Sequence, residues 1–87
     1  MNQKRILIAD DSELNRAILV SVLEKNFDIL EAADGKEAVE MFAASAPGTY
    51  DAVLMDVMMP ELDGIRATAK LREDSNVPII LLTAKSE

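Results

Sequence analysis

An apolar run ends in two acids in the stretch Ile6-Leu7-Ile8-Ala9-Asp10-Asp11-Ser12. A second apolar run, residues 52–55, ends in a third acid, Asp56. In an open α/β sheet, ligands bind outside the carboxyl ends of the strands, so we expect these three acids to share one crevice. Carboxylates held together repel each other, and a divalent cation is the ordinary way to offset that repulsion. The stretch therefore predicts both a strand and a site for a hard cation.

Apolar runs alternate with segments of helical period along the 87 residues. This pattern predicts βαβ units within one small α/β domain. The predicted strands are residues 6–9, 29–32, 52–55 and 77–82. Run 29–32 is the weakest and is expected at an edge of the sheet, whereas the other three are continuous and are expected to be buried on both faces. The predicted helices are residues 12–25, residues 36–46 and a short segment after Gly64.

The two longer predicted helices differ in their apolar surface. The helix 36–46 carries a single stripe, which consists of Ala38, Val39, Phe42, Ala43 and Ala46. The helix 12–25 has apolar residues around most of its circumference. A helix of that kind is expected to be covered on more than one side.

Composition excludes several classes of function. Nine basic and sixteen acidic residues give a net charge of -7, which is the wrong sign for gripping a phosphate backbone, so we expect no direct nucleic-acid binding by this segment. The chain has no histidine and therefore cannot itself be a phosphohistidine donor. It has no cysteine, which excludes thiolate zinc sites and disulfides and fits a reducing compartment.

The apolar segments are too short for a membrane. The longest late run, residues 77–82, falls far below the ~20 residues that a transmembrane helix needs. The apolar run that follows Lys4 and Arg5 is also much shorter than a signal-peptide core. We therefore expect a cytoplasmic protein without membrane contact.

Taken singly, acids at such positions are more often helix caps than parts of a chemical site. Their combination is more informative, because Asp10, Asp11, Asp56 and Thr83 each end a predicted strand or directly follow one. Magnesium prefers oxygen ligands, which Asp11 and Asp56 can supply. An aspartate can also attack phosphorus to give an acyl phosphate, and Thr83 can donate a hydrogen bond to the transferred group.

At this point the sequence resembles a known family, the response-regulator receiver domains of two-component signalling. Four stretches carry the resemblance, in the family's order and almost end to end: Ile6 to Ser12, Glu31 to Ala38, Val53 to Gly64 and Pro78 to Ala84. The third is the most specific of the four, and it contains Asp56-Val57-Met58-Met59-Pro60.

The resemblance implies a CheY-like, flavodoxin-like fold, a doubly wound parallel sheet with strand order 2-1-3-4-5. A complete receiver continues after the fourth strand, and its fifth strand ends in a lysine that pairs with the phosphoryl group. We therefore expect residues 1–87 to form an incomplete receiver domain, truncated after the fourth strand, in which the fourth helix, fifth strand and fifth helix are absent. Nothing in these residues is assigned the role of that lysine.

The resemblance also implies a role for each candidate residue. Asp56 matches the phosphoacceptor, which takes a phosphoryl group from a histidine on a sensor histidine kinase or a histidine phosphotransfer protein. Asp10 and Asp11 match the acidic pair that holds Mg²⁺ with Asp56, and the backbone carbonyl of Met58 matches the remaining protein ligand. Thr83 matches the switch hydroxyl. The implied function is a conformational relay, not an enzyme, which promotes only its own phosphorylation and dephosphorylation.

Two other classes of function are weighed against this one. A phosphatase of the haloacid-dehalogenase type places a second aspartate two residues after its nucleophile, and Ser12 at that position argues against it. A non-signalling interaction or dimerisation module would bind Mg²⁺ without forming an acyl phosphate. We also expect the chain to self-associate through the edge of strand 77–82 and the first helix, because bare apolar edges and patches favour pairing.

Overall fold

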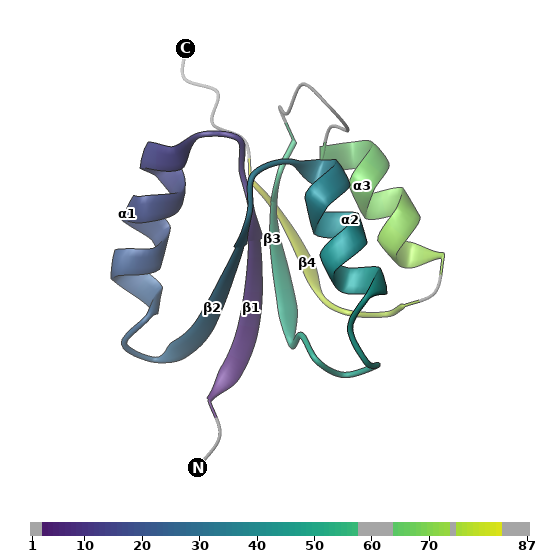
Figure 1. Cartoon of the computed structure of the whole chain (residues 1–87), viewed down its shortest axis with the longest axis horizontal. Helices are drawn as coiled ribbons and strands as arrows, with labels where there is room; N and C mark the ends of the chain where they lie inside the picture. The colour runs from purple at the N-terminus through teal and green to yellow at the C-terminus, as the bar shows by residue number, and fades with distance from the viewer. Residues whose placement is uncertain (1–2, 58–63, 74, 83–87) are drawn as a thin grey trace.

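The computed structural model describes residues 3–57, 64–73 and 75–82 (Figure 1). Strands and helices alternate strictly through the described residues, as the sequence predicts. Their bounds are β1 Lys4–Ala9, α1 Glu13–Leu23, β2 Phe27–Ala32, α2 Gly35–Ala43, β3 Ala52–Asp56, α3 Gly64–Arg72 and β4 Ile79–Leu82. None of the described helices is long and apolar enough to span a membrane.

The described strands form one parallel sheet in the order β2-β1-β3-β4. This order confirms the predicted topology and places β2 at an edge. Figure 1 shows α1 on one face of the sheet, with α2 and α3 side by side on the other. Helices on both faces are the result of right-handed crossovers that leave the centre of the sheet in opposite directions. The two directions part between β1 and β3, which is where ligands bind in such sheets.

The core lies mainly between the sheet and the α2–α3 layer. Leu7 of β1 pairs in register with Val53 of β3, and Ala9 pairs with Met55, so all four side chains face the same helices. None of the four is exposed to solvent. Aliphatic and methionine side chains thus fill this core, and they fix the relative height of β1 and β3. That register decides where the acids after these two strands lie.

Side-chain caps decide where the first two helices begin. The Ser12 hydroxyl accepts a hydrogen bond from the N–H of Asn15 at 3.2 Å. The Asp34 carboxylate accepts one from the N–H of Glu37 at 2.8 Å. Each cap satisfies a donor that has no partner inside its helix. The first helix therefore starts after Ser12, and α2 starts at Gly35, directly after its cap Asp34.

The predicted helices 12–25 and 36–46 both extend too far. The first ends at Leu23 and the second at Ala43, and Ala43 and Ala46 are exposed. The apolar stripe of α2 is therefore shorter than its sequence pattern indicates. Gly48 adopts a φ of 83°, which favours glycine, and this turn directs the chain into β3 instead of extending the helix.

Two strands begin earlier than their apolar runs. Lys4 and Arg5 pair with Phe27 and Asp28, which adds two polar residues to the start of β1 and begins β2 at Phe27. The Arg5 Nε and the Asp28 Oδ2 form an ion pair at 2.9 Å across the two strands. Backbone pairing and this ion pair, which an apolar pattern cannot report, extend the strands.

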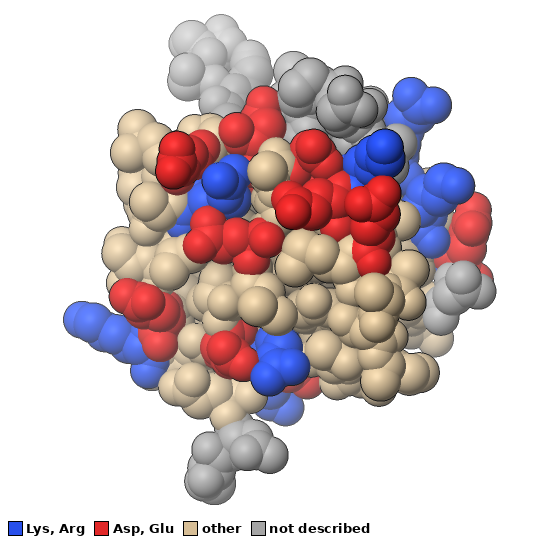
Figure 2. All heavy atoms as spheres, viewed as in Figure 1, with Lys and Arg blue, Asp and Glu red and all other residues tan. Residues whose placement is uncertain are grey.

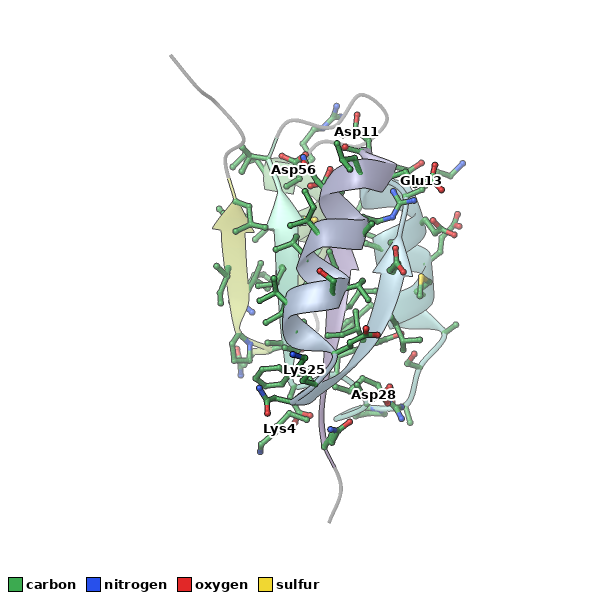
Figure 3. The ribbon with its side chains drawn as sticks, turned by 90° about the vertical axis from the view of Figure 1, so that its left-hand side faces the viewer. Lys4, Asp11, Glu13, Lys25, Asp28 and Asp56 are labelled. Atoms are coloured by element: carbon green, nitrogen blue, oxygen red, sulfur yellow. The ribbon has the colours of Figure 1, made fainter. Side chains whose placement is uncertain are left out.

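The expectation that strand 77–82 is buried on both faces is wrong. The strand covers only Ile79–Leu82, and Ile80 and Leu81 are 52% and 42% exposed. In the described sheet β4 pairs with β3 alone. Figure 3 shows that α1 lies over the middle of the sheet and does not cover β4. An apolar run indicates that a segment favours burial. Whether its side chains are buried depends on the neighbouring elements that pack over them.

The start of α3 is pressed against the backbone at the end of β3. A Cβ built on Gly64 would lie 2.6 Å from the Val57 Cα and closer still to the Asp56 carbonyl oxygen. The N–H of Gly64 donates to the Val57 carbonyl at 3.3 Å. Backbone atoms cannot move aside as a flexible side chain can, so only glycine fits here.

We predict that Gly64→Ala destabilises the fold. Helix propensity alone would make alanine better by about 1 kcal/mol, whereas overpacking against backbone costs about 3 kcal/mol. Urea denaturation at constant m-value measures the difference. Gly48→Ala is the matched control, because it meets no atom within 4 Å and should cost only about 1 kcal/mol through its positive φ. A Gly64→Ala variant as stable as the wild type would contradict the close approach.

Candidate metal centre

Three carboxylates meet where β1 and β3 end. Asp10 and Asp11 directly follow β1, and Asp56 is the last residue of β3. One carboxylate oxygen from each lies within 4.8 Å of the others. Figure 3 shows Asp11 and Asp56 at the same end of the sheet, far from Lys4 and Lys25. The cluster predicted from the sequence is thus confirmed as a spatial group.

The three acids differ in their exposure to solvent. Asp10 and Asp56 are 4% and 3% exposed, whereas Asp11 is exposed. Two unit charges ~4.8 Å apart repel each other by roughly 3 kcal/mol at an effective dielectric near 20. Buried carboxylates of this kind are usually paired or coordinate a metal. Binding a cation would therefore reduce the repulsion within the cluster. The exposed Asp11 is the side of the cluster that faces solvent.

Hydrogen bonds hold the first acid of the cluster in place. The Asp10 N–H donates to the Ala32 carbonyl at 3.2 Å, which ties the residue to the end of β2. One oxygen of its carboxylate accepts the N–H of Ser12 at 2.8 Å. A single Asp10 oxygen thus has a backbone partner, and the carboxylate keeps its second oxygen for the cluster. Oxygen donors in this number suit a hard cation such as Mg²⁺.

Two residues that sequence reasoning overlooked also contribute to the site. Arg16, in the first turns of α1, donates from its Nη1 to the Asp10 carbonyl oxygen at 2.6 Å. Gly64 allows α3 to start against the backbone of Asp56. Two sequence signals could have identified these residues. One is an arginine shortly after an acid pair, and the other is a glycine at the start of a helix. Both residue types are common in such places, so neither signal is specific.

Two sequence-predicted site residues, Met58 and Thr83, lie outside the described residues. Leu82, the last residue of β4, is the register partner of Asp56, and its carbonyl accepts the Val57 N–H at 3.0 Å. The roles of Met58 and Thr83 stay predictions.

The charge on the visible surface favours a cation at this end. On the face shown in Figure 2, acidic side chains gather over the upper half, above the carboxyl ends of the strands and the start of α2. The whole sequence has a net charge of -7. A field of one sign raises the local concentration of ions of the other sign, so cations are drawn toward the cluster.

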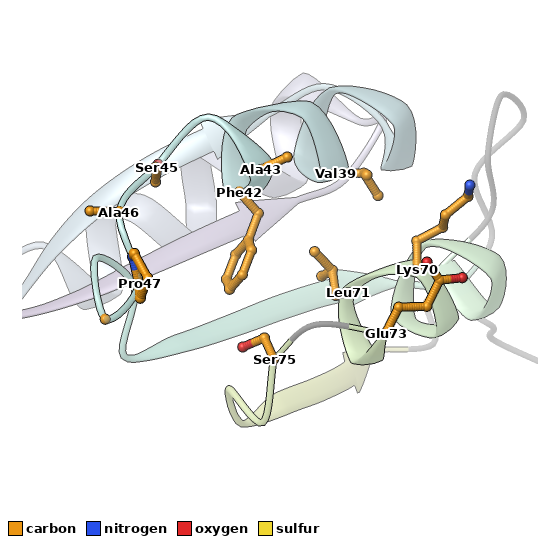
Figure 4. A pocket seen from close by; sticks show the side chains of 11 residues that line it. Val39, Phe42, Ala43, Ser45, Ala46, Pro47, Lys70, Leu71, Glu73 and Ser75 are labelled. Atoms are coloured by element: carbon orange, nitrogen blue, oxygen red, sulfur yellow. The ribbon is translucent and has the colours of Figure 1, made fainter.

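A separate cavity of about 390 Å³ lies between the C-terminal parts of α2 and α3 (Figure 4). Phe42 and Leu71 extend into it from the two helices. The Phe42 ring also stacks on Tyr50, with ring centroids 5.5 Å apart. Glu73 is the one acid in its described lining. The described lining of the cavity holds no cluster of carboxylates and shares no residue with the cation site.

Comparisons with known proteins agree with the site geometry. Residues 6–87 match the response regulator receiver domain family. The transcriptional regulatory protein SrrA of Staphylococcus aureus is 46% identical over 83 residues, which is 94% of this chain and 33% of SrrA. The chain thus spans about a third of the length of this curated relative.

Solved structures show the same fold. The response regulator protein TrrA from Thermotoga maritima, in complex with Mg(2+)-BeF, aligns with a TM-score of 0.86 and 36% identity over 97% of this chain and 72% of its own. The Francisella response regulator 1452 receiver domain aligns with a TM-score of 0.86 and 34% identity over 98% of this chain and 69% of its own.

These matches do not favour the interaction module or the phosphatase as the function. The family match spans nearly the whole sequence, and Asp10, Asp11 and Asp56, the acids on which the resemblance depends, meet at the carboxyl edge of the sheet. Family and geometry therefore agree. The protein belongs to the receiver domains of the response regulators of two-component signalling.

Proposed function

We propose that Asp56 is the phosphoacceptor of this receiver domain and that Asp10, Asp11 and Asp56 hold Mg²⁺ during the transfer. The observation that carries the proposal is the approach of three carboxylates within 4.8 Å at the switch point of a doubly wound sheet. Bound Mg²⁺ supplies positive charge that offsets the charge developing on the transferred group. The TrrA structure, which contains Mg(2+)-BeF, supports this choice of metal.

The reaction needs little covalent chemistry from the protein. An oxygen of Asp56 forms a bond to phosphorus while the bond between phosphorus and the donor's imidazole nitrogen breaks, and the nitrogen keeps the electron pair. The chain contributes by positioning. Asp56 sits at the end of a central strand and is 3% exposed, which keeps the carboxylate in one place and restricts the approach of water.

The other residues have supporting roles in this proposal. Asp10 has one oxygen occupied by the Ser12 N–H, so it suits a ligand more than a nucleophile. Asp11 is exposed and would hold the cation from the solvent side of the cluster. The Met58 carbonyl is the proposed further protein ligand, and the Thr83 hydroxyl is the proposed donor to the transferred phosphoryl group. These last two roles rest on the resemblance to the family.

The proposed donor is a phosphohistidine on a sensor histidine kinase or a histidine phosphotransfer protein, because the chain itself has no histidine. On this proposal the domain receives a phosphoryl group and relays it as a conformational signal, and it promotes only its own phosphorylation and dephosphorylation. The net charge of -7 opposes direct contact with nucleic acid. The lack of cysteine fits the reducing cytoplasm as the place of the reaction.

We predict that Mg²⁺ stabilises the chain and that Asp56→Asn reduces this effect. A ligand that binds only the folded state adds about 2.7 kcal/mol at a hundred times its Kd. In the apo state, Asp56→Asn should raise Tm by roughly 4–8 °C, because relief of about 1 kcal/mol has that effect in a domain of this size. Thermal melts with and without Mg²⁺ measure both effects. An apo Tm lowered by the substitution would refute the repulsion argument.

The control for these melts is Asp28→Asn. Asp28 pairs with Arg5 at 2.9 Å at the opposite end of the sheet, so the same change of residue type occurs far from the cluster. It should leave the Mg²⁺ effect unchanged. A loss of that effect in the control would mean that overall charge, rather than the site, binds the cation.

We predict that acetyl phosphate with Mg²⁺ modifies Asp56 and no other residue. The reason is that Asp56 alone of the three acids combines burial with a place inside a strand. Borohydride trapping followed by peptide mapping locates the adduct, and intact mass reports its stoichiometry. Asp56→Asn should remain unmodified, and Asp28→Asn should react as the wild type does. A label on Asp10 or Asp11 would show that the acceptor is misassigned, and Mg²⁺ binding without any label would favour the interaction module.

We also propose that the 87 residues form one folding unit, the first seven elements of a receiver domain, and that this unit self-associates. Leu14, Ile18 and Val22 lie four residues apart on α1 and are 69%, 53% and 64% exposed. The exposed Ile80 on β4 adds to this apolar surface. A row of large apolar side chains on a helix, together with an exposed apolar side chain on the same face, favours pairing with another chain.

We predict a two-fold dimer that buries β4 and α1. Sedimentation equilibrium over a wide concentration range gives the dissociation constant, and Ile80→Lys should shift the equilibrium toward the monomer because a charge cannot be buried without a partner. Ile65→Lys is the matched control, since Ile65 is equally exposed but lies on α3, on the other face. A wild-type monomer at all concentrations would exclude the dimer.

A further inference from the structure

Arg16 connects three parts of the chain that surround the carboxylate cluster. Its Nη1 donates to the Asp10 carbonyl oxygen at 2.6 Å, and its Nε donates to the Glu31 carboxylate at 3.0 Å. Its side chain is only 16% exposed, although it belongs to the first turns of α1. Arginine has a rigid fork of donors, which suits it to hold two acceptors in fixed directions.

The carbonyl that Arg16 holds belongs to the peptide unit between Asp10 and Asp11. Strand β1 ends at Ala9, so this carbonyl lies just past the paired part of the sheet. The N–H of Asp10 is held by Ala32 and its carboxylate by the N–H of Ser12. The Arg16 bond to the carbonyl restrains this peptide plane directly, and the bonds to the Asp10 N–H and carboxylate restrain the residue that precedes it. The orientation of that plane sets the direction in which the Asp11 side chain leaves the backbone.

The charge of Arg16 is offset by its partner. Glu31 at the end of β2 forms an ion pair with it at 3.0 Å. A lone positive charge next to the cluster would oppose the entry of a cation. The ion pair removes most of that opposition and leaves the hydrogen bond to the Asp10 carbonyl in place. Arg16 thus still orients the Asp10 carbonyl, while Glu31 offsets its positive charge.

We infer that Arg16 is a positioning residue for the cation site, which fixes the Asp10–Asp11 peptide so that both carboxylates point into the cluster. The inference rests on the proposed function of that site. It predicts the direction in which the Mg²⁺ Kd changes when Arg16 is replaced. Removing a nearby positive charge by itself strengthens the binding of a cation, whereas losing the orientation of Asp11 weakens it. The direction of the change therefore separates positioning from charge.

The experiment is a calorimetric Mg²⁺ titration of the 87-residue chain and its variants. Arg16→Met keeps the length of the side chain and removes every donor, and it should raise the Mg²⁺ Kd about tenfold, the lower end of what supporting residues around a metal contribute. Arg16→Lys keeps the charge but lacks the fork, and it should also weaken binding. An unchanged or lower Kd in both variants would overturn the inference.

Two controls isolate the cause. Arg5→Met breaks a second described arginine–acid pair, Arg5 with Asp28 at 2.9 Å, at the far end of the sheet. It should leave the Mg²⁺ Kd unchanged. Glu31→Gln keeps an acceptor for the Arg16 Nε and removes the negative charge. The uncompensated charge of Arg16 should then raise the Mg²⁺ Kd by less than Arg16→Met does. A rise equal to or larger than that of Arg16→Met would show that the charge balance around Arg16, rather than its bond to the Asp10 carbonyl, controls the site.

A readout without metal completes the test. In the apo protein, Arg16→Met should speed amide hydrogen exchange at Asp11, whose N–H belongs to the peptide unit that loses its anchor, and at Ser12, whose N–H donates to the Asp10 carboxylate. The exchange at β3 should stay at the wild-type rate, which excludes general unfolding as the cause. Equal protection at Asp11 and Ser12 in both proteins would reject the inference. A wild type that binds no Mg²⁺ would instead reject the proposed function of the site.

Discussion

The burial of Asp10 beside Asp56 is the constraint on which the rest of this structure depends. Two carboxylates that are almost fully buried at the ends of paired strands repel each other. The surrounding structure must hold them there, because Asp10 directly follows β1 and Asp56 ends β3. An aliphatic core between β1, β3 and the α2–α3 layer does so by fixing the register of the two strands. The protein thus uses packing energy to keep a repulsive site assembled.

Such a site responds to any change of charge. A bound cation would relieve the repulsion, and the proposed phosphoryl group on Asp56 would add negative charge at the same place. Each ligand shifts the balance between arrangements of the surrounding elements only through its different affinity for them. The elements in direct contact are α1, connected through Arg16, and α3, which starts at Gly64 against the Asp56 backbone. A change at the cluster can therefore act through direct contacts on a helix at each face of the sheet.

The two faces differ in how well they are covered. The α2–α3 layer buries its side of the sheet, and Ala67 and Leu71 of α3 belong to the core. On the other face α1 has no fully buried residue, and β4 exposes Ile80. The face that carries Arg16 thus also carries the exposed apolar row Leu14, Ile18 and Val22. A partner that covered this face would lie close to the element that orients Asp11.

The sequence alone determined the order of strands and helices, the parallel sheet and the identity of the three acids. These features are local: a continuous apolar run, a cap such as Ser12 or an acid after a strand can be recognised without knowing what lies opposite. It also led to the family, through the stretch around Asp56. Helix ends and the length of β1 were less well predicted, because turns, pairing and ion pairs such as Arg5 with Asp28 decide them.

Only the tertiary structure decided the contacts between elements. The close approach of α3 to the Asp56 backbone leaves room only for glycine at position 64. Arg16 bonds both the Asp10 carbonyl and Glu31, and these bonds form only when β1, α1 and β2 are assembled. The exposure of β4 likewise depends on what covers it, and its apolar sequence predicted the opposite. The physical reason is the same in each case: sequence patterns report the preferences of single segments, whereas contact and burial depend on the register and packing of segments that are distant in the chain.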